Sequence, residues 1–322
     1  MGINVLSLFD GMSCGQIALK RVGIAVDNYF ASEVDKHAIK VTQYNYPSTI
    51  QLGDVTKVSA ENLPKIDLLL GGSPCQGFSL AGKMLNFEDE RSKLFFEYVR
   101  LLEDIKKINP NIKFILENVK MKQEWVGVID NILGVKGVFI NSRLVSAQNR
   151  PRWYWTNVCA LEQPEDKNIY LADVLESSVD EKYFIKSGRL SWLTKFGELK
   201  EKQGYVAFNP NKAKCLTARA EPSWNCTYIL QWPRGYNDGG VKAADGKTPS
   251  LTISSWPANN LLLKDGLVRK LTPVECERLQ TVPDNYTSCV SDTSRYKMLG
   301  NGWTVDVIAH ILKHTNFERT RT

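Results

Sequence analysis

The chain has 322 residues, of which 43% are hydrophobic and 24% charged, so it can bury a sizeable core and is not a disordered protein. Its length fits one large domain with a smaller one. No stretch approaches the roughly 18 uncharged apolar residues of a membrane span. Residues 1–10 lack the basic start and long apolar run of a signal peptide. We therefore expect a cytoplasmic protein with no membrane association.

The seven cysteines are scattered, and no two of them have Cys-x-x-Cys spacing. With only three histidines, the sequence favours neither a disulfide framework nor a metal site. Charge is unevenly spread: residues 181–270 contain 15 Lys and Arg against 7 Asp and Glu, a net charge of +8, in a chain whose total is +6. A basic segment on a near-neutral body indicates a polyanion partner, although a solvated surface explains it equally well.

Short apolar runs alternate with helical patterns along the first 160 residues. The predicted strands are 5–9, 24–32, 66–70 and 113–116, and the predicted helices are 16–22, 35–44 and 91–107. This alternation predicts an α/β fold with a doubly wound, mostly parallel sheet. Ligands of such sheets bind beyond the carboxyl ends of the strands.

The amino-acid composition changes after about residue 180, where Gly, Asn, Thr, Ser and Trp become more frequent and long helical periodicity disappears. Helical patterns return from residue 273. We therefore divide the chain into a first domain at 1–180, a smaller domain of short strands and loops at 181–266, and a C-terminal segment at 267–322 that returns to the first domain.

Three segments at predicted strand ends carry residues suited to nucleotide binding. Phe9–Gly15 follows the first strand and opens a helix, where glycines and a helix N-terminus favour close approach of a ligand. Its spacing is not Gly-x-Gly-x-x-Gly, and an ordinary turn would look the same. Glu33 is placed to accept ribose hydroxyls, or to favour the start of a helix. Asp54 is placed to accept an adenine amino group, or to cap a helix.

Cys75 lies in the loop Gly71–Ser79, just after a predicted strand, where backbone N–H groups favour a thiolate nucleophile. A lone cysteine is otherwise an inert buried residue. Glu117 ends a later strand and is placed to donate a proton in the same crevice. In Gln148–Trp155, alternation puts Gln148, Arg150 and Arg152 on one face, suited to carbonyl or phosphate recognition or to structural ion pairs.

In this order the motifs resemble those of the cytosine-5 DNA methyltransferases that use S-adenosylmethionine. Besides the segments above, the resemblance rests on Gly53-Asp54-Val55, Ser73–Gln76, Glu117-Asn118-Val119, Arg269-x-Leu271-Thr272, Glu277–Gln280 and Gly300-Asn301. It covers the whole chain, whose length is similar to that of the compact bacterial and phage members. The resemblance implies the Rossmann-like methyltransferase fold and a target-recognition domain at 181–266.

The resemblance also implies a mechanism. Cys75 would add to cytosine C6, Glu117 would hold a proton against N3, Arg152 would bind O2, and Arg150 would support Arg152 or contact a phosphate. The flipped cytosine would lie in double-stranded DNA at a short specific site, and the enzyme would act as a monomer, as in restriction-modification systems.

Two further groups of residues follow from the resemblance. The cofactor-binding residues would be Phe9, Asp10, Gly11, Gly15, Glu33, Val34, Asp54, Val55, Pro74, Asn301 and Val305. The DNA-binding residues would be Gln76, Ser79, Lys83, Arg219 and Arg234.

Three alternatives stay open at this point. An RNA methyltransferase of the same fold would act on tRNA. A catalytically silent DNA-binding relative would have lost the Pro-Cys or Glu-Asn-Val residues, which are intact here. A nicotinamide-dependent oxidoreductase would carry the Gly-x-Gly-x-x-Gly motif, which is absent.

Overall fold

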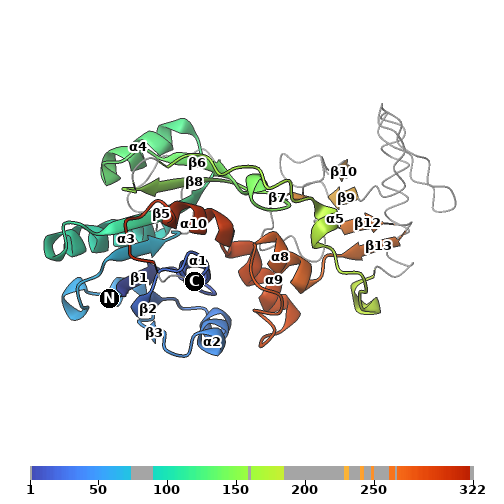
Figure 1. Ribbon diagram of the computed structural model, residues 1–322, viewed down its shortest axis with the longest axis horizontal. Helices are drawn as coiled ribbons and strands as arrows, with labels where there is room; N and C mark the ends of the chain where they lie inside the picture. The colour runs from blue at the N-terminus through green and yellow to red at the C-terminus, as the bar shows by residue number, and fades with distance from the viewer. Residues whose placement is uncertain are drawn as a thin grey trace.

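Seven strands form one sheet in the order β3-β2-β1-β4-β5-β8-β6 (Figure 1). Their bounds are β1 (Ile3–Leu8), β2 (Val26–Ser32), β3 (Ile50–Gln51), β4 (Leu68–Gly71), β5 (Lys113–Val119), β6 (Val138–Asn141) and β8 (Pro151–Thr156). The first five strands in this order are mutually parallel, and β8 runs antiparallel to both of its neighbours. The doubly wound, mostly parallel sheet expected from the sequence is therefore confirmed.

The computed structural model describes residues 2–73, 90–158, 161–184, 228–231, 240–242, 248–249, 261–264 and 267–319. Seven residues assigned to the site from the sequence lie outside these ranges: Pro74, Cys75, Gln76, Ser79, Lys83, Arg219 and Arg234.

Strict alternation of side chains gives the sheet two buried faces. On β4, Leu68 and Leu70 enter one hydrophobic cluster, whereas Leu69 enters the other. On β8, Tyr154 and Trp155 separate in the same way. Successive side chains of a strand point to opposite faces, so both faces must be covered by helices.

Helices cover the two faces as separate layers. One face packs against α1 (Cys14–Arg21), α2 (Lys36–Asn45) and α10 (Val305–Leu312), and the other against α3 (Glu90–Ile108) and α4 (Gln123–Leu133). The sequence predicted α1 to α3 within two residues at each end but did not predict α4. None of the described helices has the length and apolarity needed to cross a membrane.

The strand predicted at 113–116 continues to Val119, because β8 pairs with β5 as far as the Val119–Arg152 register. Glu117 and Asn118 therefore lie inside the strand. The local apolar pattern ends at Leu116. The strand β5 extends beyond that residue only because it pairs with β8, which is distant in the sequence.

The C-terminal helices α8 (Pro273–Leu279), α9 (Asp292–Asn301) and α10 follow a second, four-stranded sheet. Its strands, in the order β10-β9-β12-β13, are β9 (Tyr228–Gln231), β10 (Gly240–Lys242), β12 (Leu261–Lys264) and β13 (Leu267–Lys270). The last helix, α10, packs against α1 of the first layer. The two domain boundaries expected from the sequence stay a prediction.

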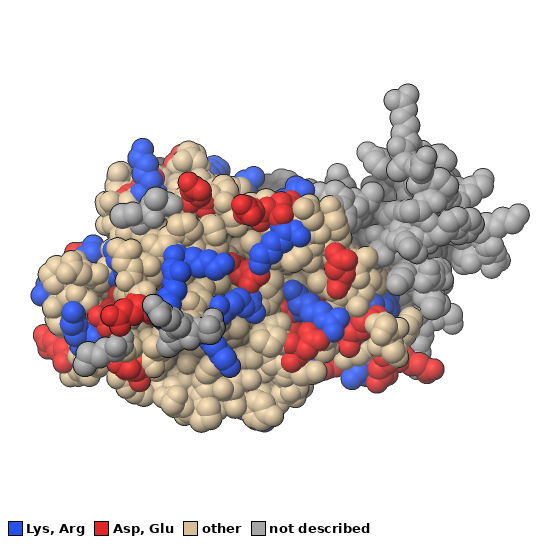
Figure 2. Space-filling model, viewed as in Figure 1, with Lys and Arg blue, Asp and Glu red and all other residues tan. Residues whose placement is uncertain are grey.

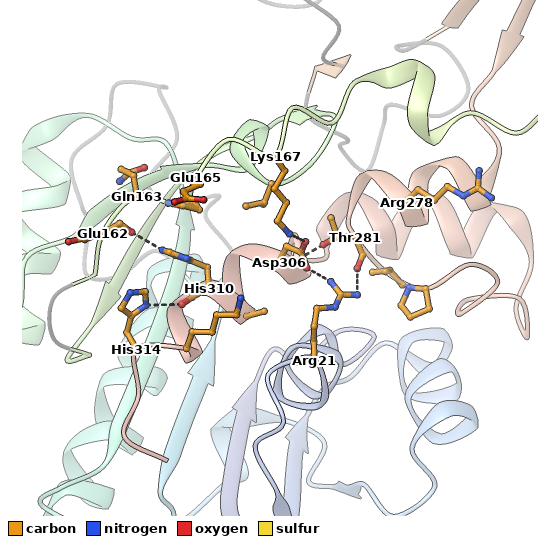
Figure 3. A pocket seen from close by; sticks show the side chains of 16 residues that line it. Arg21, Glu162, Gln163, Glu165, Lys167, Arg278, Thr281, Asp306, His310 and His314 are labelled. Atoms are coloured by element: carbon orange, nitrogen blue, oxygen red, sulfur yellow. Dashed lines mark hydrogen bonds and ion pairs between the residues drawn. The ribbon is translucent and has the colours of Figure 1, made fainter. Parts of the chain in front are cut away.

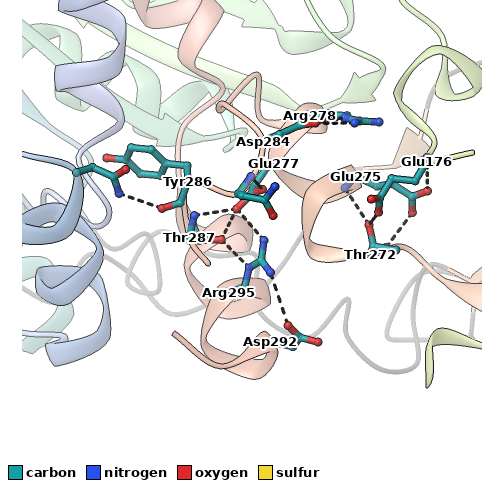
Figure 4. Close-up of polar contacts among 12 residues, drawn as sticks. Glu176, Thr272, Glu275, Glu277, Arg278, Asp284, Tyr286, Thr287, Asp292 and Arg295 are labelled. Carbon is teal, nitrogen blue, oxygen red and sulfur yellow. Dashed lines mark hydrogen bonds and ion pairs between the residues drawn. The ribbon is translucent and has the colours of Figure 1, made fainter. Parts of the chain in front are cut away.

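Two buried carboxylates fasten this C-terminal region (Figure 4). Glu277 is fully buried and accepts from the Arg295 guanidinium at 3.0 Å and from the Thr287 N–H at 2.9 Å. Glu275 binds Arg269 with two contacts of 2.7 Å, which ties β13 to α8. Because removing one partner of a buried pair costs about 3–5 kcal/mol, both pairs fix the path of the chain that leads to α9.

Candidate active site

A cleft of about 530 Å³ lies beyond the carboxyl ends of β1, β2, β4 and β5. The chain segments that line it are Phe9–Gly11, Ser32–Asp35, Gly53–Val55, Gly72–Ser73, Glu117–Val119 and Gly300–Trp303, with single residues such as Arg150, Arg152 and Met298. The volume falls within the range of small-molecule sites, and the location is the one that doubly wound sheets use for ligands.

The loop after β1 is held in an unusual backbone shape. Phe9, Gly11 and Ser13 have φ angles of 57°, 58° and 61°, a left-handed conformation that costs free energy at the two positions that are not glycine. The buried carboxylate of Asp10 accepts hydrogen bonds from the Tyr29 hydroxyl at 2.7 Å and from the Ser13 hydroxyl. These bonds fix the loop against the cleft without help from a ligand.

Glu33, at the end of β2, is held by three backbone donors. Its Oε2 accepts from the Gly11 N–H at 2.8 Å, and its Oε1 accepts from the N–H groups of Val34 and Asp35 at 2.7 and 2.8 Å. A carboxylate offers about four acceptor positions. One position on Oε2 is therefore left, enough for one ribose hydroxyl without any rearrangement.

Asp54 and Val34 lie on the same side of the cleft. Asp54 caps the short turn η1 (Val55–Lys57), and the hydrogen bonds from the N–H and hydroxyl of Thr56 lower the pKa of its carboxyl. Both roles proposed for Asp54 are thus compatible, because these two bonds use Oδ1 only. Val34 is 70% exposed although it is apolar and lines the cleft, as expected of a side chain that a ligand covers.

Gly15 and Val305, two of the expected cofactor residues, do not line this cleft. A Cβ on Gly15 would come within 2.7 Å of both Leu70 Cδ1 and the Tyr29 hydroxyl, so this glycine permits α1 to pack closely on the sheet. Val305 is fully buried at the start of α10. Asn301 does line the cleft, at the end of α9.

Glu117 and Arg152 meet at the other end of the cleft. The distance from Arg152 Nε to Glu117 Oε1 is 2.8 Å, and the two side chains are 13% and 12% exposed. The Nε–H is buried and is not aligned with a hydrogen-bond acceptor of the structure. Gly72 permits this arrangement, since a Cβ there would lie 3.2 Å from Glu117 Oε2 and 2.8 Å from Trp303 Nε1.

That Gln148, Arg150 and Arg152 share one strand face stays a prediction: Arg150 and Arg152 both line the cleft, whereas Gln148 is buried next to Gln280. Arg150 lies between β7 (Gln148–Asn149) and β8, and Pro151 at the start of β8 has no N–H to continue the ladder. The Gln148 amide donates to the Leu279 carbonyl, while Arg150 donates to the carbonyls of Gly300 and Gly302 at 3.1 and 3.0 Å. Burial and then the neighbouring Arg152 lower the pKa of Arg150 to about 10, which leaves it charged at neutral pH.

Cys14 is the cysteine that the described part of the chain brings to the cleft. Burial raises the pKa of its thiol to about 12, so Cys14 is not a thiolate at neutral pH and is unsuited as a nucleophile. Ser73, two residues before Cys75, lines the same cleft and accepts from the Asn118 amide. Among the described residues, no group of three His, Cys, Asp or Glu could hold a metal ion.

Trp303 and Lys297 are two of the cleft residues that sequence reasoning missed. Trp303 lines the cleft two residues after the Gly300-Asn301 motif, and an aromatic residue at that spacing was the available signal. Lys297 on α9 pairs with Asp35 at 2.7 Å. No local sequence pattern relates Lys297 to Asp35, because the two residues are far apart in the chain.

A second cleft, of about 830 Å³, lies between α1, α10 and the segment 162–167 (Figure 3). Its central acid, Asp306, is already paired with Arg21 and with Lys167, and Arg21 also donates to the Thr281 carbonyl. Burial lowers the pKa of His310, whose Nε2 lies 2.7 Å from the Glu162 carbonyl. Because these charged groups already pair with one another, the first cleft is the better candidate for the active site.

Asp10 makes the stability of the protein depend on pH in an unusual direction. Burial raises the pKa of its carboxyl from 3.8 to about 6, so the folded state disfavours the ionised form. The resulting stabilisation is complete below pH 3.8 and is lost as the pH rises through 6. As the pH rises from 4.5 to 8, the free energy of unfolding of Asp10→Asn should therefore increase by about 2 kcal/mol relative to that of the unsubstituted protein. Urea unfolding at the two pH values would measure this change.

Asp54→Asn is the control for this experiment. The pKa of Asp54 is lowered, so its contribution to stability is lost only as the pH falls below the ordinary value near 3.8. The stability difference for Asp54→Asn should be nearly constant between pH 4.5 and pH 8. If the stability difference between Asp10→Asn and the unsubstituted protein were also constant, the raised pKa of Asp10 would be wrong.

A seven-stranded sheet with one antiparallel strand, and a cleft at the carboxyl ends of its parallel strands, define the Rossmann-like fold of S-adenosylmethionine-dependent methyltransferases. A family model described as C-5 cytosine-specific DNA methylase matches residues 3–124 and 146–316. The chain belongs to this family, and it is therefore an enzyme, a DNA (cytosine-5-)-methyltransferase.

Individual proteins agree with this assignment. The chain is 31% identical to the type II methyltransferase M1.ScrFI of Lactococcus lactis subsp. cremoris over 95% of its own length and 76% of that protein's. It is 31% identical to the type II methyltransferase M.HpaII of Haemophilus parainfluenzae, covering 94% and 86%. Among solved structures, the Entamoeba histolytica methyltransferase EhMeth matches with a TM-score of 0.69 at 18% identity, covering 98% of both chains, which supports the fold.

Proposed function

We propose that this enzyme transfers a methyl group from S-adenosylmethionine to C5 of a cytosine at a short specific site in double-stranded DNA. The reaction would pass through a covalent bond between the Cys75 sulfur and cytosine C6. The observation that carries the proposal is the largely buried Glu117–Arg152 pair, 2.8 Å apart, in the same cleft as Glu33 and as Ser73, which is two residues before Cys75 in the chain.

The cleft fits S-adenosylmethionine in its chemistry. Glu33 keeps one acceptor position for a ribose hydroxyl, the exposed Val34 offers an apolar cover, and Asp54 keeps one oxygen for an adenine amino group. Phe9–Gly11, Val55 and Asn301 complete the wall. When bound, S-adenosylmethionine supplies an electrophilic methyl group on a sulfonium.

The residues at the other end of the cleft would activate the cytosine. The Cys75 thiolate adds to C6 and the ring electrons move to C5, which becomes the nucleophile. Glu117 holds a proton at N3 and so neutralises the charge that this addition places on the ring. Arg152, whose Nε lies 2.8 Å from Glu117 Oε1, would offer its guanidinium N–H groups to the cytosine O2. After methyl transfer, loss of the C5 proton lets the Cys75 sulfur leave.

A stacked base cannot reach such a cleft, so the cytosine must be flipped out of the duplex. Gln76, Ser79 and Lys83 follow Cys75 and would contact the DNA around it. Arg219 and Arg234 belong to segment 181–266, which we propose as the target-recognition domain and which makes up most of the basic segment 181–270. On the described part of the face in Figure 2, Lys and Arg alternate with acids, so the basic segment is the stronger candidate for phosphate contacts.

The relatives named above are type II methyltransferases, which supports a role in restriction-modification. We propose that the enzyme acts as a monomer on DNA in the cytoplasm of a bacterium or a phage-infected cell.

Bisulfite sequencing of plasmid DNA from bacteria that express the protein would test the function. Protected cytosines in one short sequence context, absent with an empty vector, are the expected result, and they would also reveal the recognition site. The purified protein would be offered duplex DNA and tRNA in parallel. Methylation of tRNA alone, by folded protein that binds S-adenosylmethionine, would overturn the DNA substrate.

A further inference from the structure

The end of helix α9 has carbonyl groups that the helix itself leaves unpaired. The last four carbonyls of any α-helix lack intrahelical donors. Here the Gly302 N–H donates to the Met298 carbonyl at 2.7 Å. Side chains from elsewhere in the chain donate to the carbonyls that follow. The turn that follows, Gly300–Trp303, lines the cleft.

Gln280 supplies much of this external pairing. Its Nε2 donates to the carbonyls of Leu299 and Gly302 at 2.6 and 3.2 Å, and its Oε1 accepts from the Thr304 hydroxyl at 2.9 Å. Its backbone carbonyl accepts the Val305 N–H at 3.0 Å. One fully buried glutamine thus holds the turn at both of its ends.

Two neighbours reinforce this arrangement. Gln148 is also fully buried, and its Nε2 lies 3.3 Å from Gln280 Oε1, which orients the Gln280 amide. Arg150 donates to the Gly302 carbonyl from another side, where its positive charge suits the carbonyl end of a helix.

Within the turn, Trp303 lies near Gly72 at the Glu117 end of the cleft, whereas Gly302 lies in the half where the cofactor would lie. A Cβ on Gly302 would lie 2.8 Å from Met12 Cε and 3.5 Å from Cys14 Sγ, so this glycine sits against the loop that follows β1. The Met12 carbonyl accepts in turn from the Tyr286 hydroxyl at 2.8 Å. A shift of the turn by a few tenths of an ångström would therefore move the wall of the cofactor half directly.

We propose that Gln280 is a positioning residue for S-adenosylmethionine, which acts from outside the cleft by fixing the Gly300–Trp303 turn against the loop after β1. This inference rests on the proposed function, since it takes S-adenosylmethionine as the ligand of the cleft. A turn that is already in place binds its ligand without an ordering cost, so loss of Gln280 weakens cofactor binding and leaves later steps largely intact.

The test compares three variants by isothermal titration with S-adenosylmethionine and with S-adenosylhomocysteine, and by steady-state kinetics. Gln280→Met keeps the volume but removes the amide, and it should raise the Kd for both ligands and the KM for S-adenosylmethionine about tenfold. The kcat and the Kd for DNA should stay within about threefold of their original values. Gln148→Met, which removes the contact with the Gln280 amide and the hydrogen bond to the Leu279 carbonyl, should give a smaller shift of the same kind.

Tyr296→Phe is the matched control, because it removes a buried hydrogen bond of 2.6 Å from α9 to the Leu271 carbonyl, away from the turn. It should lower the melting temperature without changing the Kd for cofactor. If Gln280→Met does not fold, Gln280→Glu takes its place, since a carboxylate keeps the shape but has no N–H to donate.

The outcomes separate the two proposals. If the unsubstituted protein binds neither ligand, the proposed cofactor is wrong. If it binds both, and the Gln280 variants bind them no more weakly than Tyr296→Phe at equal loss of stability, Gln280 is a structural residue only and the inference is overturned. A fall in kcat with unchanged Kd and KM would overturn it as well.

Discussion

Cys75→Ala is expected to leave no detectable methylation, a loss of at least about 10⁴-fold, because the variant has no atom that can bond to cytosine C6. Without that bond, C5 of cytosine is too weak a nucleophile to take a methyl group. Bisulfite sequencing of plasmid DNA would measure the loss in cells, and transfer of a labelled methyl group to duplex DNA would measure it with purified protein.

A covalent trap would distinguish a lost nucleophile from a damaged fold. DNA with 5-fluorocytosine at the target site accepts the methyl group but cannot lose fluorine as a cation, so the sulfur–C6 bond persists and survives denaturation. The unsubstituted enzyme should form this complex, and Cys75→Ala should not. Cys289→Ala, at a partly exposed free cysteine, serves as the control and should behave like the unsubstituted enzyme. A trapped complex with Cys75→Ala would refute the assignment.

Glu117→Gln is expected to slow methyl transfer by about 10²–10⁴-fold, since an amide cannot bring a transferable proton to cytosine N3. In the enzyme without DNA, where Glu117 is the negative partner of Arg152 at 2.8 Å, the substitution also leaves a largely buried guanidinium without its counter-charge. Single-turnover rates with saturating cofactor and DNA would isolate the chemical step from binding.

Glu97→Gln is a suitable control for this substitution. Glu97 also pairs with an arginine, Arg100 on α3, at 2.6 Å, but it lies outside the cleft. Its rate should stay within about twofold of the original, as expected of a partly exposed ion pair. Equal rates for both variants would show that Glu117 does not take part in the chemistry.

Much of the site was predictable because it lies at the ends of strands that local pattern reveals. Glu33 and Asp54 follow short apolar runs, and parallel strands bring their carboxyl ends to one edge of the sheet. The order of the motifs then identified the family, which the family match over residues 3–124 and 146–316 confirms. Local sequence thus carried the fold class and the position of the cleft.

The roles of Arg150, Gln148 and Gln280 were not predictable in this way. Alternation placed Gln148 and Arg150 on the face of Arg152, but it could not identify their partners, which are Leu279 for Gln148 and Gly300 and Gly302 for Arg150. These partners lie more than 130 residues along the chain, and hydrogen bonds between such distant residues leave no periodicity to detect.

Sequence alone therefore determined which residue types stand at each strand end, and with them the class of chemistry. The tertiary structure alone decided which of those side chains reach the cleft: Asn301 lines it, whereas Gly15 serves the packing of α1 on the sheet. The reason is physical. Strand and helix periodicity follow from the backbone, whereas the surroundings of a side chain depend on segments that meet only after the chain has folded.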